Sequence, residues 1–386
     1  QGYSGGGGRF DYAYFDDATL AQYAKQAVDQ ALLNLRASPA PAGTMTSSAV
    51  HFKPGDVLYG RLRPYLNKVY RPTFEGLCSA EFIVLPENER VDGAYLQYFL
   101  NSSAFVRYAS HLNAGDRPRV DFDQLASYEM PLPEVDEQRR IVAEIEKQFS
   151  RLDEAVANLK RVKANLKRYK AAVLKAAVAG DLTPKTSTWQ TVQLGTVAAV
   201  VDPQPSHRTP PVDPGGVPYV GLGDFRVDET IDLQNARKVS PSVLEEHRAR
   251  YRLKVGDFVF GKIGTIGQPA RLPTPFDYAL SANLVLIQPD ESRISSGFAF
   301  VVMASPQVSA ASEEAKSATT QAAFGIKRIR QLTVDLPSII EQRAIVAEVD
   351  RRLSLLAATE HQVERGLHRA RSTRASLLSK AFGVAR

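Results

Sequence analysis

Residues 132–144 read LPEVDEQRRIVAE, and residues 336–348 read LPSIIEQRAIVAE. The two stretches lie 204 residues apart, and this register continues without a gap to Ala177 in the first copy and Ala381 in the second. Similarity at one fixed, long offset indicates a duplicated architecture. The sequence therefore predicts two copies of one plan, in which a globular module is followed by a long helix.

The repeat extends upstream of these stretches. Residues 55–61 read GDVLYGR and face residues 256–262, which read GDFVFGK, at an offset of 201. The offset changes between the two parts of the repeat, as expected when surface loops gain or lose residues on a retained scaffold.

Each module shows short apolar runs rich in Val, Ile, Phe and Tyr and bounded by Gly, Pro or Asp. Such runs predict strands, here at residues 57–59, 82–85, 258–260 and 284–287. Helices are predicted at residues 94–110 and 296–314. Each module is therefore expected to be a mixed structure with a small, mostly β core, of fold class α+β.

A different pattern begins after Pro133, where an apolar residue recurs every seven positions, as in a long helix with a coiled-coil seam. The positions are Ile145, Leu152, Leu159, Leu166 and Val173 in the first copy, and Val349, Leu356, Val363, Ala370 and Leu377 in the second. Gly180 and Pro184 predict where the first helix ends. Two helices of matching length hide their seams most simply against each other, antiparallel. The alternative is that each helix packs on its own module.

The predicted domains are a first module at residues 1–133, a central helix at 134–183, a second module at 184–337 and a C-terminal helix at 338–386. Residues 1–44 are atypical or incomplete, because nothing in them matches the entry strand predicted at residues 189–195.

Composition sets broad limits on function. The 48 Lys and Arg against 42 Asp and Glu leave a net charge of +6, which permits nucleic-acid binding without requiring it. The single Cys78 cannot form an intrachain disulfide, and no apolar run has the length of about 18 residues that a membrane span needs. We expect a soluble, cytoplasmic protein without a membrane partner.

Taken together, the motifs resemble those of the specificity subunits of type I restriction-modification enzymes. In the first half the resemblance is carried by GDVLYGRLRPYLNK at residues 55–68, Pro-Leu-Pro at 131–133 and EQRRIV at 137–142. The second half adds Trp189 with Leu194-Gly195, then VPYV at 217–220, Gly256-Asp257 and GTIG at 264–267. The resemblance covers about residues 45–386.

This resemblance implies two target-recognition domains, each reading one half of an interrupted double-stranded DNA site, with the helices acting as a ruler between them. It also implies a subunit that is not an enzyme and needs no cofactor of its own. Its partners would be two methyltransferase subunits, which carry S-adenosylmethionine and methylate adenine, and through them the ATP-dependent restriction subunits.

Candidate DNA contacts are chosen by chemistry, since Arg and Lys suit guanine, Asn and Gln suit adenine, and other basic residues hold phosphates. In the first module they are Arg61, Arg63, Lys68, Arg117 and Arg119, with Arg117-Pro118-Arg119 the leading group. In the second module they are His207, Arg208, Lys262, Arg271, Thr319, Thr320, Gln321, Lys327 and Arg328. The alternative for each basic residue is an exposed side chain that only solvates the surface.

The Glu-Gln-Arg residues that open each long helix recur identically, so they are expected to perform one role twice. They are Glu137, Gln138 and Arg139 in the first copy and Glu341, Gln342 and Arg343 in the second. That role is either capping of the helix start, where acidic residues are favourable, or docking of a methyltransferase copy. The basic stretch at residues 160–170 is a solvated face, a phosphate contact or a site for an acidic partner.

The alternative functions are those of a methyltransferase or nuclease fragment and of a structural coiled-coil linker. An adenine methyltransferase needs an Asn-Pro-Pro-Tyr or Asp-Pro-Pro-Tyr loop for the flipped base, whereas residues 209–212 read Thr-Pro-Pro-Val. Residues 261–267 lack the phosphate-loop pattern, and the histidines lack metal-ligand spacing. The residues therefore favour a non-catalytic DNA-binding subunit.

Overall fold

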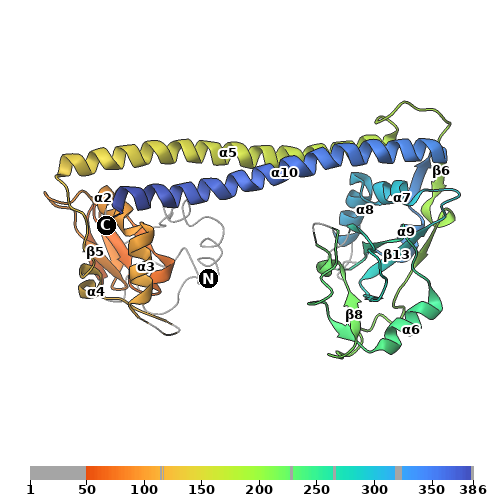
Figure 1. Cartoon of the computed structure of the whole chain (residues 1–386), viewed down its shortest axis with the longest axis horizontal. Helices are drawn as coiled ribbons and strands as arrows, with labels where there is room; N and C mark the ends of the chain where they lie inside the picture. Colours follow the sequence, from red (N-terminus) through yellow and green to blue (C-terminus); the bar gives the residue numbers. More distant parts are fainter. Residues whose placement is uncertain are drawn as a thin grey trace. The chain divides into compact units, whose positions relative to one another are not determined.

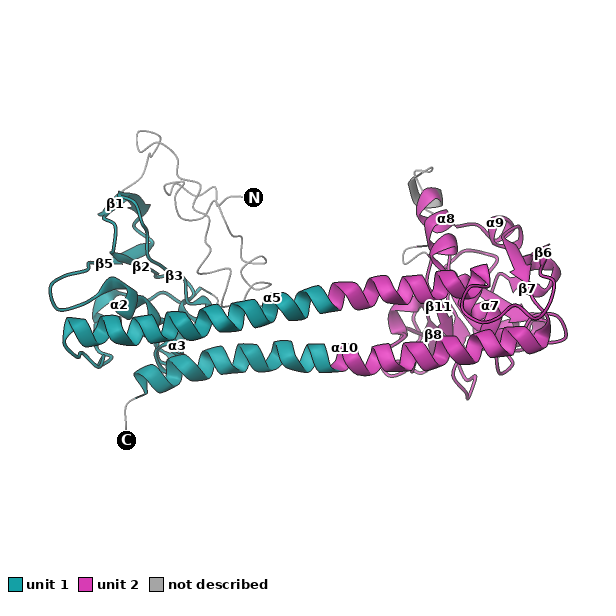
Figure 2. Cartoon of the chain, turned by 90° about the horizontal axis from the view of Figure 1, so that it is seen from above, with its two compact units in different colours: residues 1–162, 362–386 teal, residues 163–361 magenta. Residues whose placement is uncertain are grey.

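The computed structural model describes residues 49–113, 115, 117–226, 229–263, 267–317 and 324–383. The chain divides into two compact units, one of residues 1–162 and 362–386 and the other of residues 163–361 (Figure 2). Each unit holds one globular module together with a segment of each of two long helices, α5 (Val135–Ala179) and α10 (Ile339–Phe382).

The described module of the first unit contains two small antiparallel sheets and three short helices (Figure 1). One sheet pairs β1 (Ala49–Phe52) with β4 (Gly76–Ser79), and the other has the order β3 (Val69–Tyr70), β2 (Val57–Gly60), β5 (Phe82–Leu85). The helices are α2 (Gly93–Leu100), α3 (Ser103–His111) and α4 (Phe122–Ala126). Strand β2 is buried along its whole length, as expected for a central strand of apolar residues.

The module of the second unit is larger. Its main sheet has the order β11 (Pro269–Arg271), β10 (Phe258–Gly261), β13 (Leu284–Pro289), β7 (Ala198–Val201). A second sheet orders β12 (Ala279–Leu280), β8 (Val217–Val220), β9 (Lys238–Val239), and a third pairs β14 (Thr333–Leu336) with β6 (Gln190–Gln193). The helices are α6 (Pro241–Arg250), α7 (Ser296–Met303), α8 (Pro306–Ser317) and α9 (Ile326–Arg330).

The predicted repeat appears in the backbone geometry of the two modules. Gly55 and Gly256 both have φ of 97°, a left-handed conformation that glycine adopts without strain. The next residue is an aspartate in both copies, and its carboxylate accepts a backbone N–H at 2.8 Å, from Lys53 in one module and Lys254 in the other. The same tight turn therefore leads into β2 and into β10.

The four strands predicted from apolar runs are confirmed, whereas each predicted helix is two helices. Residues 94–110 form α2 and α3, and residues 296–314 form α7 and α8. Ser102 and Ser305 mark the two breaks and are both buried. Ser102 accepts a hydrogen bond from the Phe105 N–H and so caps α3, while Pro306 starts α8 because it has no N–H to continue α7.

The long helix predicted after Pro133 is confirmed and ends at Ala179, followed by Gly180 with φ of 75°. In the first unit, α5 and α10 run antiparallel. Asp153 pairs with Arg374 and Leu159 lies against Gly366, so residue numbers rise along one helix where they fall along the other. All ten predicted seam positions are buried or half-buried. Neither long helix, nor any other described helix, has the length and apolarity needed to cross a bilayer.

The long helices also contribute to the core of each module. In the first unit the Phe382 ring at the end of α10 lies 5.1 Å from the Tyr95 ring, beside α2 (Figure 1). In the second unit Val173 of α5 and Ile345 of α10 are buried in the core that surrounds α7. The helices therefore pair with each other and pack on the module as well.

Candidate nucleic-acid interface

The predicted arginines of the first module meet at one edge of its central sheet. The loop of residues 61–68 connects β2 with β3, and a β-bridge joins it to the segment 117–120. The Arg63 N–H donates to the Pro118 carbonyl at 2.7 Å. Two separate loops thus bring four predicted contacts together: Arg61, Arg63, Arg117 and Arg119.

These arginines differ in their surroundings. Arg119 is 58% exposed at its side chain and pairs with Glu81, while Arg117 is exposed. The Arg61 Nε is buried and has no hydrogen-bond acceptor in the described part of the chain. This edge therefore carries several arginines, and the acidic side chain of Glu81 pairs with one of them, Arg119.

Lys262, the counterpart of Arg61 in the second module, does not lie on the surface. Its side chain is 5% exposed, and its Nζ lies 2.9 Å from Asp202 Oδ2. Asp202 follows β7, a strand without a counterpart in the described part of the first module. Lys262 therefore forms an internal ion pair and does not present its ammonium group to DNA in this conformation.

The loop after β7 presents two other predicted residues. His207 is 63% exposed, adopts a left-handed φ of 52°, and holds its Nε2 3.9 Å from the same Asp202 carboxylate. Arg208 follows it and is exposed. This loop therefore offers a histidine and an arginine to solvent beside a half-buried acid.

Two more predicted arginines of the second module are held against aromatic rings. The Arg271 guanidinium lies 4.2 Å from the centre of the Phe300 ring, and the Arg328 guanidinium lies 6.0 Å from that of Phe324. Such stacking orders an arginine, and each of the two also lies near an acid, Arg271 at 4.0 Å from Glu229 and Arg328 at 3.9 Å from Glu314. Lys327 is exposed on α9, while the predictions for Thr319, Thr320 and Gln321 lie outside the described residues.

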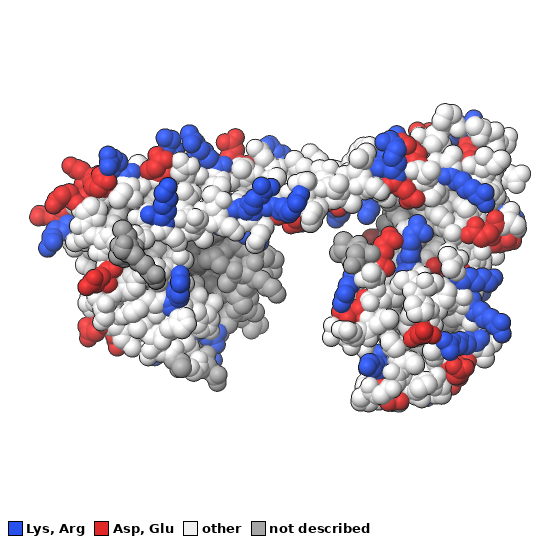
Figure 3. Space-filling view, in the orientation of Figure 1, with Lys and Arg blue, Asp and Glu red and all other residues white. Residues whose placement is uncertain are grey.

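Charge is not segregated on the face drawn in Figure 3, where Lys and Arg of the second module are interspersed with Asp and Glu. The predicted basic stretch of α5 is exposed on its helix: Lys160, Arg161, Lys163, Lys167, Arg168 and Lys170.

The middle residue of the first Glu-Gln-Arg motif has an interior role. Gln138 is fully buried, and its Oε1 accepts the backbone N–H of Asp92, the N-cap residue of α2, at 2.9 Å. Its Nε2 donates to the carbonyls of Arg90 at 2.7 Å and Pro133 at 2.8 Å. The side chain therefore joins the start of α5 to the start of α2.

The second motif repeats this joint in the other unit. Gln342 is fully buried, and its Oε1 accepts the backbone N–H of Ser295, the N-cap residue of α7, at 2.7 Å. Its Nε2 donates to the carbonyls of Arg293 at 3.0 Å and Pro337 at 2.9 Å. Neither glutamine presents a surface to a partner in this conformation, and neither caps its own helix.

The motif glutamates differ between the two copies. Glu341 is buried and accepts hydrogen bonds from Trp189 Nε1 at 3.0 Å and from Ser187 Oγ at 2.6 Å. Burial acts to raise the pKa of Glu341, but these hydrogen bonds outweigh it and lower the pKa below the ordinary value. Glu137 instead pairs with Arg140 at the surface. Arg139 and Arg343 are exposed.

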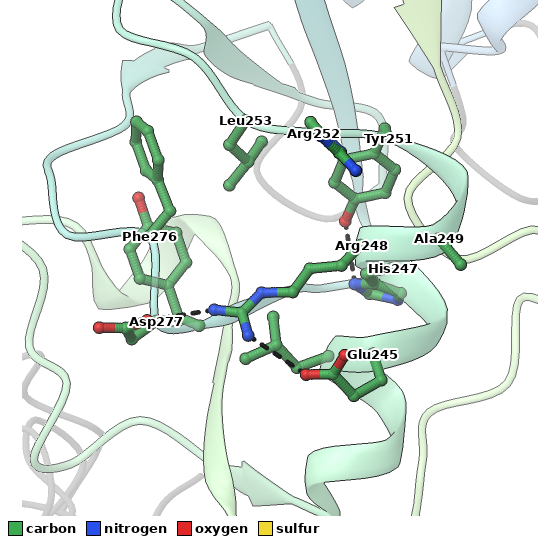
Figure 4. A pocket seen from close by; sticks show the side chains of 11 residues that line it. Glu245, His247, Arg248, Ala249, Tyr251, Arg252, Leu253, Phe276 and Asp277 are labelled. Atoms are coloured by element: carbon green, nitrogen blue, oxygen red, sulfur yellow. Dashed lines mark hydrogen bonds and ion pairs between the residues drawn. The ribbon is translucent and has the colours of Figure 1, made fainter.

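A pocket of about 670 Å³ opens between α6 and residues 276–278 of the second module (Figure 4). Arg248 extends along it and pairs with Glu245 at 3.2 Å and Asp277 at 3.1 Å. Arg248 in this pocket therefore already has two acidic partners.

Sequence reasoning missed a buried polar chain beside this pocket. His247 Nε2 lies 2.7 Å from Gln204 Oε1, and its Nδ1 lies 2.9 Å from the Tyr251 hydroxyl. Burial, helped by the nearby Arg250 charge, lowers the pKa of His247 to about 4. The imidazole is thus neutral at pH 7, donating to the amide oxygen and accepting from the hydroxyl. No local pattern signals this contact, because Gln204 is distant in sequence.

Comparisons with known proteins agree on one family. A family model described as the type I restriction modification DNA specificity domain matches residues 186–365. The chain is 31% identical over 142 residues to the type I restriction enzyme EcoDI specificity subunit of Escherichia coli, covering 36% of this chain and 31% of that protein. It is 25% identical over 273 residues to the EcoBI specificity subunit of the same organism, covering 66% and 57%. Both matches span less than two thirds of the relative's length.

Solved structures share the fold over more of the chain. A chain from a study of complex assembly and conformational transition of the type I R-M system aligns with a TM-score of 0.69 and 21% identity, covering 86% of this chain and 82% of that one. The crystal structure of the HsdS subunit from Thermoanaerobacter tengcongensis aligns with a TM-score of 0.54 and 21% identity, covering 86% and 81%. At this level of identity the likeness is one of fold.

Proposed function

We propose that the chain is a specificity subunit of a type I restriction-modification system, and that it recognises a two-part DNA sequence without catalysing a reaction itself. The observation that carries the proposal is duplication. The match to a DNA specificity domain, residues 186–365, covers the second module and continues into α10. The first module repeats the central strand of the second and the Gly-Asp turn before it. Two such modules in one chain are suited to two half-sites, one read by residues 1–133 and the other by residues 184–337.

We assign the DNA contacts to loops of the two modules and, in the second module, also to strand β11 and helix α9. In the first module they are Arg61, Arg63, Lys68, Arg117 and Arg119. In the second module they are His207, Arg208, Arg271, Lys327 and Arg328, with Thr319, Thr320 and Gln321 predicted from the sequence. Arginines ordered by ring stacking or by a fixed loop are suited to reading base edges, whereas the more mobile lysines are suited to holding phosphates.

We further propose that α5 and α10 form an antiparallel coiled coil that joins the modules and sets the gap between the half-sites. The antiparallel contacts within the first unit and the half-buried seam of each helix support this arrangement. A pair of packed helices has a fixed length for a given number of residues, which is the property that a molecular ruler needs.

Methylation and cleavage are assigned to partner proteins, namely two methyltransferase subunits and, through them, restriction subunits. The names of the relatives, which are specificity subunits of restriction enzymes, support such an assembly. Exposed members of the Glu-Gln-Arg motifs, such as Glu137, Arg139 and Arg343, remain candidate partner contacts. Since the proposed ligand is genomic DNA, we place this work in the cytoplasm.

The proposal is tested by selecting bound duplexes from a library of random DNA, using the full chain co-expressed with its methyltransferase. We expect enrichment of two short fixed sequences separated by a constant number of unread base pairs. A structural linker protein would enrich no sequence, and a single uninterrupted site would contradict recognition by two modules.

A further inference from the structure

The loop of residues 61–68 has an unusual backbone. A single turn of 3-10 helix, η2 (Pro64–Leu66), is bracketed by Arg63 with φ of 55° and Asn67 with φ of 43°. Both residues are left-handed although neither is glycine, and such conformations persist only where the surrounding structure holds them. Strain of this kind concentrates at functional sites.

The contacts that hold this turn come from both sides. Asn67 is 4% exposed and donates from Nδ2 to Asn101 Oδ1 at 3.0 Å, at the end of α2. On the other side Arg63 is tied through its N–H to Pro118. The turn is therefore clamped between a helix end and the neighbouring loop.

The clamped turn displays one aromatic ring. Tyr65 is 48% exposed, although Pro64 before it and Asn67 after it are buried. Folding a loop so that its polar residue is buried and its tyrosine is exposed costs hydrophobic free energy and polar desolvation. This inversion has a physical reason if the ring is covered by a ligand.

The chemistry around Tyr65 favours nucleic acid as that ligand. The turn begins at Arg63 and is hydrogen-bonded to the segment 117–119, which carries two more arginines, one of them paired with Glu81. In duplex DNA an apolar side chain in the major groove contacts the thymine methyl group, while basic side chains contact base edges and phosphates. A protein partner would more readily meet a rim of both charge signs.

We propose that Tyr65 is a DNA-contacting residue that determines the sequence preference of the first module. Its ring packs against a base edge of the first half-site, while Arg63 and Arg117 contact neighbouring base edges. This inference rests on the proposed function and deepens it. The equivalent loop of the second module, residues 262–267, reads KIGTIG and has no aromatic residue, so the contact is specific to one half-site.

The test uses the full chain in the same duplex selection, with Tyr65→Ala, Tyr65→Phe and the control Tyr169→Ala. Tyr169 is a matched control because it is 47% exposed but lies on α5. Loss of one base–aromatic contact is expected to weaken binding roughly ten-fold or more. Tyr65→Ala should lose selectivity at the first half-site and keep it at the second. Tyr65→Phe keeps the ring and should stay within about three-fold of the wild type, as should Tyr169→Ala.

Three results would overturn the inference. Tyr65→Ala with wild-type selectivity at both half-sites would remove Tyr65 from DNA while the proposed function stands. Normal selectivity with lost methyltransferase assembly would make the ring a protein contact. If the wild type itself selects no sequence, the proposed function fails independently of Tyr65. Should Tyr65→Ala fold poorly in a melting experiment, Tyr65→Leu, which keeps apolar bulk but not the ring, gives the same comparison.

Discussion

Gln138 and Gln342 are buried polar side chains, and a buried amide is tolerated only when its donors and acceptors are satisfied. Each makes three hydrogen bonds, to equivalent places in its own unit. The recurrence of Gln at this position follows from that geometry, because no other side chain of similar length supplies both a carbonyl oxygen and two N–H groups.

We predict that Gln342→Ala destabilises the protein by about 3 kcal/mol, since it removes these bonds and leaves backbone groups without partners. The measurement is the denaturant midpoint of the full chain. Gln362→Ala, an exposed glutamine of the same helix, is the control and should change stability by less than about 0.5 kcal/mol. Equal midpoints for the two variants would contradict the structural role of Gln342.

His247 gives a prediction about pH. Its folded pKa of about 4 lies below the ordinary value of 6.5, so between these values the unfolded chain binds more protons than the folded one. Stability is therefore lost as the pH falls from 6.5 towards 4, by up to about 3 kcal/mol from this residue. The variant His247→Gln has no titratable group at this position and should lack this part of the pH dependence.

The measurement compares the wild type with His247→Gln in denaturation at pH 7 and pH 4.5, so that carboxylates common to both cancel. The wild type should lose more stability than the variant on acidification. An equal loss of stability in both proteins would show that the pKa of His247 is the same in the folded and the unfolded chain.

At the scale of elements, the pairing of α5 with α10 in the first unit depends on a buried arginine. Arg374 is 7% exposed, pairs with Asp153 at 2.8 Å and lies 4.1 Å from the centre of the Phe149 ring. We predict that Arg374→Ala costs about 2 kcal/mol, a value reduced because Asp153 is partly solvated. Arg374→Lys should lose less stability than Arg374→Ala but more than none, since an ammonium group keeps the charge but does not stack on the ring as a guanidinium does.

Thermal melting followed by circular dichroism measures these changes, with the exposed Arg371→Ala as control. A melting temperature for Arg374→Ala equal to that of the control would show that the pairing does not need this contact.

Elements whose burial follows a local apolar pattern, a continuous run in a strand or a seven-residue repeat in a long helix, could be predicted from the sequence. Strands β2 and β10 and the two long helices are of this kind, because burial and local pattern agree. The break between α2 and α3 was missed, since apolar residues continue across Ser102 and the cap becomes visible only in the folded backbone. Local patterns locate elements more reliably than their ends.

The candidate site was predicted less completely, because its chemistry depends on pairs distant in sequence. Lys262 was predicted to contact DNA, whereas its side chain forms an ion pair with Asp202. Glu341 looked like a cap or a docking residue, whereas Trp189 and Ser187 enclose it. Tyr65 gave no sequence signal of its own, because its exposure depends on the clamp around Asn67.

At the scale of the whole molecule, the proposed ruler gives a prediction about length. Inserting four residues after Ala164 and four at the facing position of α10, near His361, lengthens the helix pair by about 6 Å. At about 3.4 Å per base pair the gap between the half-sites should grow by roughly two base pairs. Duplex selection reads the gap directly, and an unchanged gap in the lengthened protein would contradict the ruler.

The glutamine joint has a consequence for how such chains diversify. Every group that meets the Gln138 and Gln342 amides belongs to the main chain, so the fit is indifferent to which side chains the module carries. A foreign module grafted onto either helix would bring a compatible socket with it, provided that it preserved the turn before its α2 or α7 equivalent. Exchanging an entire domain would leave these hydrogen bonds in place, while the apolar contacts between the helix and the core of the module would still have to match.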